Sequence, residues 1–222
     1  MPRIVGALTI GQSPRVDLIP EMRAILGTGV EIIEAGALDG MTLDEVREIA
    51  PGPGDQVLVT RMADGTPVKI AERHILSRMQ SQIDSLVERG AEIIALVCTG
   101  EFPDFRCSKL VVRPQRVLYH ATAAVSAGLS LGVLVPDGDQ VDCTERRWQG
   151  AAGEVKAEAA SPYGNPDAVR RAASRLKEWG AGLVVMDCIG YTLAMKESVK
   201  RQTGVPVILA RSIVARALAE LL

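Results

Sequence analysis

The chain has 222 residues, a formal net charge of −2 and 47% hydrophobic residues, which is the composition of an ordinary globular protein. Its 25 Lys and Arg against 27 Asp and Glu exclude a strongly basic protein, so we expect no nucleic-acid partner. Only two histidines are present, which excludes a three-histidine zinc site. The four cysteines, none of them in a CxxC pair, are therefore the first candidates for chemistry.

The first apolar run, within MPRIVGALTIGQSPR, is much shorter than the ~20 residues that a membrane span needs. It also lacks the cleavage region of a signal peptide. We therefore expect a cytoplasmic protein without membrane association, whose thiols are kept reduced.

Short apolar runs bounded by Gly or Pro alternate with amphipathic segments along the chain, a pattern that predicts an α/β fold with a mainly parallel sheet. Strands are expected at 3–10, 29–35, 56–60, 92–98, 131–135, 182–187 and 205–209. Helices are expected at 15–26, 43–50, 73–89, 115–127, 140–149, 166–179, 193–203 and 211–221. Residues 56–72 depart from this plan, because Asp64-Gly65 between two strand-like segments predicts a hairpin.

An internal repeat divides the chain. GAEIIALVCTG at 90–100 aligns without gaps to GAGLVVMDCIG at 180–190, and Gly90 and Gly180 suit the left-handed position after a helix. A weaker match pairs VGALTIG at 5–11 with LGVLVPD at 131–137. We interpret the repeat as two related α/β halves, each with a cysteine at the carboxyl end of a strand.

Cys98 and Cys188 are the two matched cysteines. In open α/β sheets, ligands bind outside the carboxyl ends of the strands, where a helix N-terminus stabilises a thiolate. Two opposed thiols suit removal of a proton next to a carboxylate on one face and its return on the other. The resulting carbanion needs fixed N–H and hydroxyl donors. The candidates for these donors are Ser13, Thr99, Gly100 and Gly190.

We expect no catalytic role for the remaining two cysteines or for the two histidines. Cys107 and Cys143 have no counterpart in the repeat and are expected to be structural. His74 is expected to be a surface cap, and His120 a packed or exposed histidine rather than a base.

Several charged residues keep two interpretations. Asp187 precedes Cys188 and is either a group supporting the site or a buried carboxylate paired with an arginine. Arg15, Arg61 and Arg211 either bind a substrate carboxylate or have structural or surface roles. Ser212 is expected to be a helix N-cap.

The sequence contains no GxxxxGK[ST], GxGxxG after a strand, HExxH or GxSxG motif. We therefore expect neither a cofactor nor a metal ion.

Motifs spread over essentially the whole chain resemble those of the AroM-type proteins. They are TIGQSPR, CTGEFP at 98–103, GVLVP at 132–136 followed by Gln140 and Trp148, and DCIG at 187–190. AroM-type proteins are in turn similar to the aspartate/glutamate/hydantoin racemase superfamily. This resemblance implies two pseudo-symmetric, flavodoxin-like, three-layer α/β domains with mainly parallel sheets and a cleft between them. It also implies cofactor-independent catalysis by Cys98 and Cys188, with Thr99 as the polar residue after the first cysteine.

We predict a first domain at 1–114, with residues 210–222 packing back on it, and a second at 115–209. The predicted function is racemisation or epimerisation of a small carboxylate or amino-acid-like substrate by two-cysteine proton transfer. The substrate-binding residues are expected to be Ser13, Arg15, Thr99, Gly100, Ile189 and Gly190.

Three alternatives remain open, because the superfamily's CNT-like and GCTH-like motifs are here CTG and DCIGYT. They are a malonate-type decarboxylase, a cis-trans isomerase using one cysteine, and a non-catalytic small-molecule binding protein. A homodimer is the expected oligomeric state.

Overall fold

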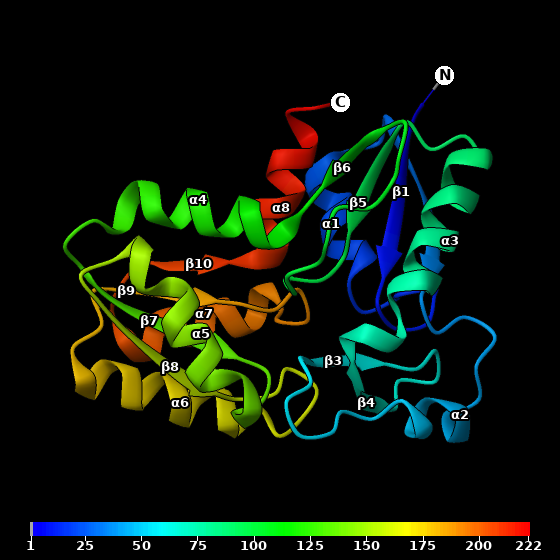
Figure 1. Ribbon diagram of the computed structural model, residues 1–222. Helices are drawn as coiled ribbons and strands as arrows, with labels where there is room; N and C mark the ends of the chain where they lie inside the picture. The colour runs from blue at the N-terminus through cyan, green and yellow to red at the C-terminus, as the bar shows by residue number, and fades with distance from the viewer. Residues whose placement is uncertain (1) are drawn as a thin grey trace. The chain divides into compact units, whose positions relative to one another are not determined.

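The computed structural model describes residues 2–222 and contains two compact units (Figure 1). The first unit comprises the chain up to Pro114 together with Ala215–Leu222, and the second comprises Gln115–Val214.

A parallel four-stranded sheet with the order β2-β1-β5-β6 forms the centre of the first unit. Its inner strands are continuous apolar runs, as expected for strands covered on both faces. The strands are β1 Arg3–Thr9, β2 Val30–Gly36, β5 Ile93–Leu96 and β6 Leu110–Val112.

Helices of the first unit pack against this sheet. The apolar face of α3 places Met79, Ile83 and Leu86 in the core beside Leu8 and Ile94. The helices are α1 Ile19–Leu26, α2 Leu43–Glu48 and α3 Leu76–Glu88, with a 3₁₀ turn at Glu72–His74.

The predicted hairpin is confirmed: β3 Val57–Arg61 and β4 Pro67–Ala71 form an antiparallel pair. Gly65 in its turn has a φ of 90°, which favours glycine.

The second unit repeats the design with the sheet order β10-β9-β7-β8, again fully parallel. The chain passes through the strands of both sheets in the same order. In the second sheet, β7, β8, β9 and β10 take the places that β1, β2, β5 and β6 have in the first. The strands are β7 Ser130–Val135, β8 Glu154–Ala159, β9 Leu183–Met186 and β10 Val207–Leu209.

Helices lie on both faces of the second sheet, and Figure 1 shows α4 and α6 on opposite sides of it. The rings of Tyr119 on α4 and Trp148 on α5 lie 5.4 Å apart, which joins these two helices on one face. The helices are α4 Pro114–Ser126, α5 Val141–Trp148, α6 Pro166–Trp179 and α7 Leu193–Thr203. Helix α8, Ala210–Ala219, begins in this unit and continues into the first unit from Ala215. Two 3₁₀ turns lie at Gly138–Gln140 and Gln149–Ala151.

Equivalent glycines let helices approach both sheets closely. A Cβ at Gly6 would lie 3.1 Å from Ala91 and 3.2 Å from Leu86, and one at Gly132 would lie 3.2 Å from Ala181 and 3.0 Å from Leu176. Gly90 and Gly180 both have a φ of 95°, as the repeat predicted. The predicted fold class, two related α/β units with parallel sheets, is confirmed.

The prediction of Ser212 as an N-cap is wrong. Helix α8 begins at Ala210, directly after β10, so Ser212 lies in its first turn and its hydroxyl donates to the carbonyl of Leu209 at 3.1 Å.

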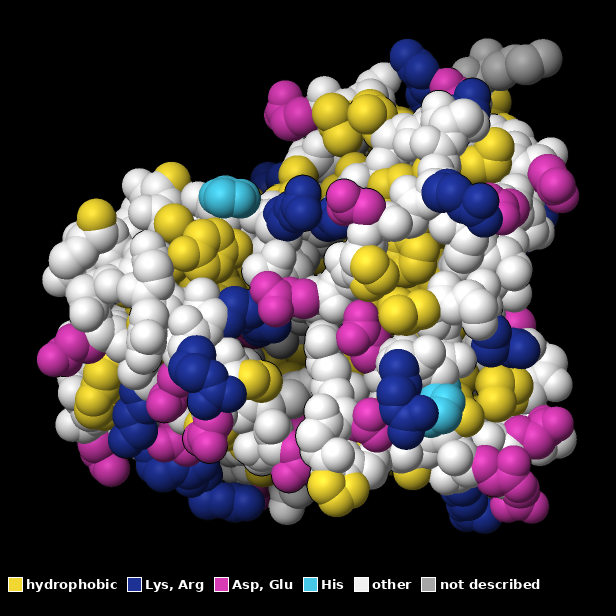
Figure 2. All heavy atoms as spheres, viewed as in Figure 1, with side chains coloured by type: hydrophobic (Ala, Val, Ile, Leu, Met, Phe, Trp, Pro, Cys, Tyr) yellow, Lys and Arg dark blue, Asp and Glu magenta, His cyan; other side chains and the backbone are white. Residues whose placement is uncertain are grey.

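Charged side chains of both signs are interspersed on the molecular face in Figure 2. Among residues 2–222, none of the helices combines the length and apolar character that crossing a membrane requires.

Candidate active site

Cys98 lies two residues beyond the end of β5, at the carboxyl edge of the first sheet. The N–H of Val97 still donates to Leu8 on β1 at 2.7 Å, which fixes the start of this loop. The N–H of Gly100 donates to the sulfur of Cys98 at 3.3 Å, and the thiol is half-buried. Thr99 between them is buried, so the predicted first Cys-x-Gly loop is an ordered turn around a sulfur.

Cys188 occupies the equivalent place after β9. The N–H of Asp187 donates to Leu134 on β7 at 2.9 Å, and that of Gly190 donates to the sulfur of Cys188 at 3.3 Å. Ile189 is buried, whereas the thiol of Cys188 is half-buried. Each half therefore presents a thiol and an N–H donor at the same point of its sheet.

Glycine is required at the end of the second loop. A Cβ at Gly190 would lie 2.6 Å from the hydroxyl of Tyr163 and 2.9 Å from Pro162. At Gly100 the nearest atoms would be 3.0 Å away, on Leu58 and Phe102. Both loops leave little room for a side chain beside the N–H that points at sulfur.

Ser13 lies in the loop after β1, but its hydroxyl is engaged within that loop. The Oγ of Ser13 donates to Asp39 Oδ2 at 2.7 Å, and its N–H donates to Asp39 Oδ1 at 2.7 Å. The same carboxylate accepts the N–H of Gly36 at 2.7 Å. Asp39 thus fixes the β1 and β2 loops, and the hydroxyl hydrogen of Ser13 points to Asp39.

Sequence reasoning did not identify Asp39. The available signal was its position three residues after Gly36, because β2 pairs with β1 and both end at the same edge.

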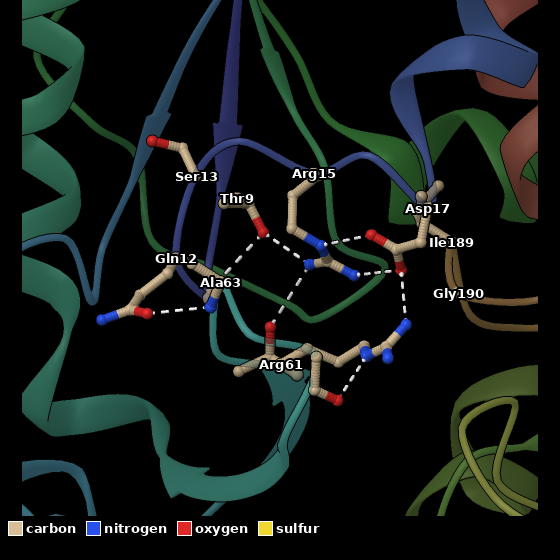
Figure 3. Close-up of polar contacts among 12 residues, drawn as sticks. Thr9, Gln12, Ser13, Arg15, Asp17, Arg61, Ala63, Ile189 and Gly190 are labelled. Atoms are coloured by element: carbon tan, nitrogen blue, oxygen red, sulfur yellow. Dashed lines mark hydrogen bonds and ion pairs between the residues drawn. The ribbon is translucent and has the colours of Figure 1, made fainter. Parts of the chain in front are cut away.

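Arg15 is almost fully buried and is held by a second carboxylate (Figure 3). Its Nε and Nη2 donate to the two oxygens of Asp17, each at 2.9 Å, and its Nη1 donates to Thr9 Oγ1 at 2.8 Å. Arg61 approaches Asp17 at 3.7 Å and donates to the carbonyl of Gly65 at 2.9 Å. Burial raises the pKa of Asp17, but the hydrogen bonds and charge of Arg15 outweigh it and keep the pKa below its usual value.

Arg15, Asp17 and Arg61 line a cavity of about 170 Å³ together with the hairpin turn. Both arginines, which the sequence predicts as candidates for binding a carboxylate, contact the carboxylate of Asp17 beside this cavity. Their role in binding a substrate stays a prediction.

Asp187 is the buried member of an ion pair. Its Oδ2 accepts from Arg147 Nη2 at 2.5 Å and from the indole N–H of Trp148 at 2.9 Å, and both donors lie on α5. Of the two interpretations of Asp187, the structure shows the carboxylate paired with an arginine. The repeat places Val97 at the equivalent position of the first half, so the two loops differ in charge.

Arg211 also lies in the second unit, where it is 1% exposed. It donates from Nε to the carbonyl of Ile189 at 3.0 Å and from Nη2 to that of Gly190 at 3.1 Å. Sequence reasoning named Arg211 only as a possible carboxylate clamp and missed its link to the Cys188 loop.

The other cysteines and the histidines lie apart from these loops. Cys107 packs against the first core, and Cys143 is exposed and donates to the carbonyl of Gln140. His74 ends a 3₁₀ turn, and His120 is exposed beside Tyr119. Among residues 2–222, no three His, Cys, Asp or Glu side chains gather as metal ligands would.

Several solved structures share this fold. The chain is similar to allantoin racemase from Pseudomonas fluorescens, with 17% identity, a TM-score of 0.58, and coverage of 98% of this chain and 89% of that one. It is similar to glutamate racemase from Aquifex pyrophilus, with 14% identity, a TM-score of 0.61, and coverage of 99% and 84%. Maleate cis-trans isomerase from Nocardia farcinica has 13% identity and a TM-score of 0.65, with coverage of 98% and 91%.

A search of the curated proteins found no match. The sequence model of the AroM family, described as AroM protein, matches residues 5–222 and confirms the resemblance of the motifs. The chain therefore belongs to the AroM family.

Proposed function

We propose that the protein is a cofactor-independent racemase or epimerase of a small carboxylate or amino-acid-like compound. The observation that carries this proposal is the equivalence of the two Cys-x-Gly loops. Each follows the same strand of its sheet, and each directs a glycine N–H at the sulfur at 3.3 Å. An N–H donor favours the charged form of sulfur, which a base requires.

In the proposed reaction, the thiolate of one cysteine takes the α-proton of the substrate and becomes a thiol. The thiol of the other cysteine gives its proton to the opposite face of the same carbon and becomes a thiolate. The centre is inverted, the proton count is unchanged, and the reverse reaction exchanges the two roles. Backbone N–H groups of Thr99 and Ile189 are the proposed donors to the substrate carboxylate, while those of Gly100 and Gly190 donate to the two sulfurs.

The similar solved structures support this class of reaction. They include racemases of allantoin, glutamate and aspartate, all with a likeness over almost the whole of this chain. These three compounds, with other amino acids and hydroxy acids, form the first set of substrates to test.

The test follows each substrate enantiomer separately in deuterated water. Two-base racemisation introduces deuterium at the α-carbon as the other enantiomer forms, which proton NMR and chiral chromatography detect together. The Cys98→Ser and Cys188→Ser variants should each lose inversion, while each exchanges the α-proton of the one enantiomer that faces its remaining cysteine. Cys107→Ser is the matched control and should keep full activity. A Cys98→Ser variant that racemises at the full rate contradicts the proposal.

A second candidate is a one-cysteine reaction, either cis-trans isomerisation or decarboxylation of a malonate-like acid. The observation that favours it is the difference between the loops, since a buried Asp187 stands where the first half has Val97. The likeness to maleate cis-trans isomerase points the same way. Conversion of maleate to fumarate, or release of carbon dioxide from a malonate, by a variant lacking one cysteine would favour this candidate over racemisation.

A further inference from the structure

A buried guanidinium is attached to the loop that carries Cys188. Arg211 follows β10 in the first turn of α8 and is 1% exposed. Its contacts go to the carbonyls of Ile189 and Gly190, at 3.0 and 3.1 Å.

The contact with Ile189 also orients a donor toward sulfur. The carbonyl of Ile189 and the N–H of Gly190 belong to one peptide unit, which is planar and directs these two groups in opposite directions. Arg211 binds the carbonyl end, and Cys188 accepts the N–H at 3.3 Å from the other end. The cation therefore fixes and polarises the peptide that donates to the sulfur.

The position equivalent to Arg211 after the edge strand of the first sheet has an uncharged residue. Ile94 pairs with Val111 in the first sheet, and Val184 pairs with Val207 in the second. Four residues after Val207 the chain has Arg211, whereas four residues after Val111 it has Gln115.

Two ionisable groups lie beside Cys188 in the chain. Asp187 is paired with Arg147 of α5. Tyr191 is fully buried and donates to the carbonyl of Ala160 at 2.6 Å, and burial together with the charges of Cys188 and Asp187 keeps its pKa well above 10.

Three further groups belong to neighbouring segments. Tyr163 approaches Gly190 from the segment after β8. Asp137 and Asp139, in the turn after β7, are more exposed to solvent, which screens their charges. Arg211 is more deeply buried than either, so its charge is screened less.

We propose that Arg211 is a positioning residue that turns the Ile189–Gly190 peptide toward Cys188 and favours the thiolate there, so that Cys188 and not Cys98 is the resting base. Only the consequence rests on the proposed function: the first α-proton leaves toward Cys188, and catalysis starts from one preferred enantiomer.

The test measures thiol reactivity without substrate. Iodoacetamide reacts with a thiolate, forming a carbon–sulfur bond and releasing iodide, and mass spectrometry of peptides follows all four cysteines in one sample. Rates are compared across pH 5.5–10, because the midpoint of the pH profile reports the thiolate fraction more directly than one rate does. In the unmodified protein, we expect the midpoint of Cys188 to lie below that of Cys98.

The Arg211→Gln variant introduces the residue type found at the equivalent position, Gln115. We expect its Cys188 midpoint to rise by about one pH unit, which corresponds to an alkylation rate near pH 7 lower on the order of tenfold. The rates of Cys98 and Cys143 should not change. Arg211→Lys keeps the charge but loses the two-pronged geometry, and should restore part of the shift. Gln115→Ala is the matched control and should leave Cys188 unaffected.

Two results would overturn the proposal. One is an Arg211→Gln variant with an unchanged circular dichroism spectrum and an unchanged Cys188 midpoint. The other is an unmodified protein in which Cys188 and Cys98 have equal midpoints, a comparison that remains decisive if Arg211→Gln fails to fold. Since no substrate is present, an absence of racemase activity does not affect either result.

Discussion

At Asp187, a buried carboxylate depends on one arginine and one indole. Replacing it by Asn keeps the size of the side chain but leaves Arg147 without the negative charge. Removing one partner of a buried pair costs about 3–5 kcal/mol of stability. We expect a smaller loss here, about 1–3 kcal/mol in the free energy of unfolding, because Arg147 reaches solvent. Urea unfolding measures the difference.

The exposed pair between Asp167 and Arg170 on α6 is the matched control for Asp187→Asn. Asp167→Asn should change the free energy of unfolding by less than about 1 kcal/mol, because exposed pairs contribute little. Equal effects of the two substitutions would contradict the structural role of Asp187.

Tyr191 makes the stability of the protein sensitive to alkali. Its pKa is raised well above 10 by burial, so above pH 10 the unfolded chain releases a proton that the folded chain keeps. The unfolded state then binds fewer protons, and the free energy of unfolding falls as the pH rises through 10. Tyr191→Phe should flatten this fall, measured by urea unfolding at pH 9–11.

Tyr191→Phe also loses the hydrogen bond to Ala160, which should lower stability at every pH by about 1 kcal/mol. The slope with pH is therefore the diagnostic quantity. Tyr119→Phe, which alters a partly buried ring on α4, serves as the control, and a slope that Tyr191→Phe leaves unchanged would contradict the prediction.

Prediction at the scale of residues succeeded where a signal repeats in the sequence. The equivalent loop positions of Cys98 and Cys188 and the left-handed conformation of Gly90 and Gly180 were predicted because the halves align without gaps. The catalytic role of the two cysteines stays a prediction. Asp39 was missed, and so was the link of Arg211 to the Cys188 loop. Their hydrogen bonds reach loops that lie 26 residues and 21 or 22 residues away in the chain. No local pattern specifies which distant carbonyl or hydroxyl a buried charge will reach.

Among the elements, the contact between α6 and β7 depends on the missing side chain of Gly132. A Cβ there would lie 3.0 Å from Leu176 and 3.2 Å from Ala181, so Gly132→Ala must push the helix or its side chains outward. We expect a loss of about 1–3 kcal/mol in the free energy of unfolding, measured by urea titration. Gly182→Ala is the control, since its nearest neighbours lie at 3.6 Å; a loss as large as that of Gly132→Ala would argue against the packing explanation.

Two strands, β6 and β8, were missed from the sequence. β8, with the sequence EVKAEA, lies at a sheet edge and has one fully buried residue, Ala157, so it lacks the apolar run that marked the inner strands. β6 has three residues and is also an edge strand. Pairing with β7 and β5 stabilises them, and such pairing is a tertiary property.

For the whole molecule, the two-base proposal makes a demand on both halves together. Two sulfurs that approach one carbon from opposite faces, each at ~3.5 Å, are about 7 Å apart. We therefore expect a short bis-alkylating reagent of that span to link Cys98 to Cys188 within one chain, detected as a crosslinked peptide by mass spectrometry. Cys143 should react singly and serves as the control. Single alkylation of both Cys98 and Cys188 without a link would contradict the two-base mechanism.

The architecture was predictable because strand and helix signals alternate regularly and the repeat defines two halves. The path of each sheet follows from right-handed crossovers between adjacent parallel strands. The arginine contacts around the second Cys loop could not be predicted in this way, because Arg147 and Arg211 lie on α5 and α8, which the repeat does not include.

The shared sheet order has a consequence for how the two thiols come to differ. Two identical halves would give their thiols identical surroundings, so neither cysteine would be preferred as the base. Val97 and Asp187, like Gln115 and Arg211, are positions where the copies have diverged. Placing the same residues at these positions in both halves should bring the reactivities of the two thiols closer together.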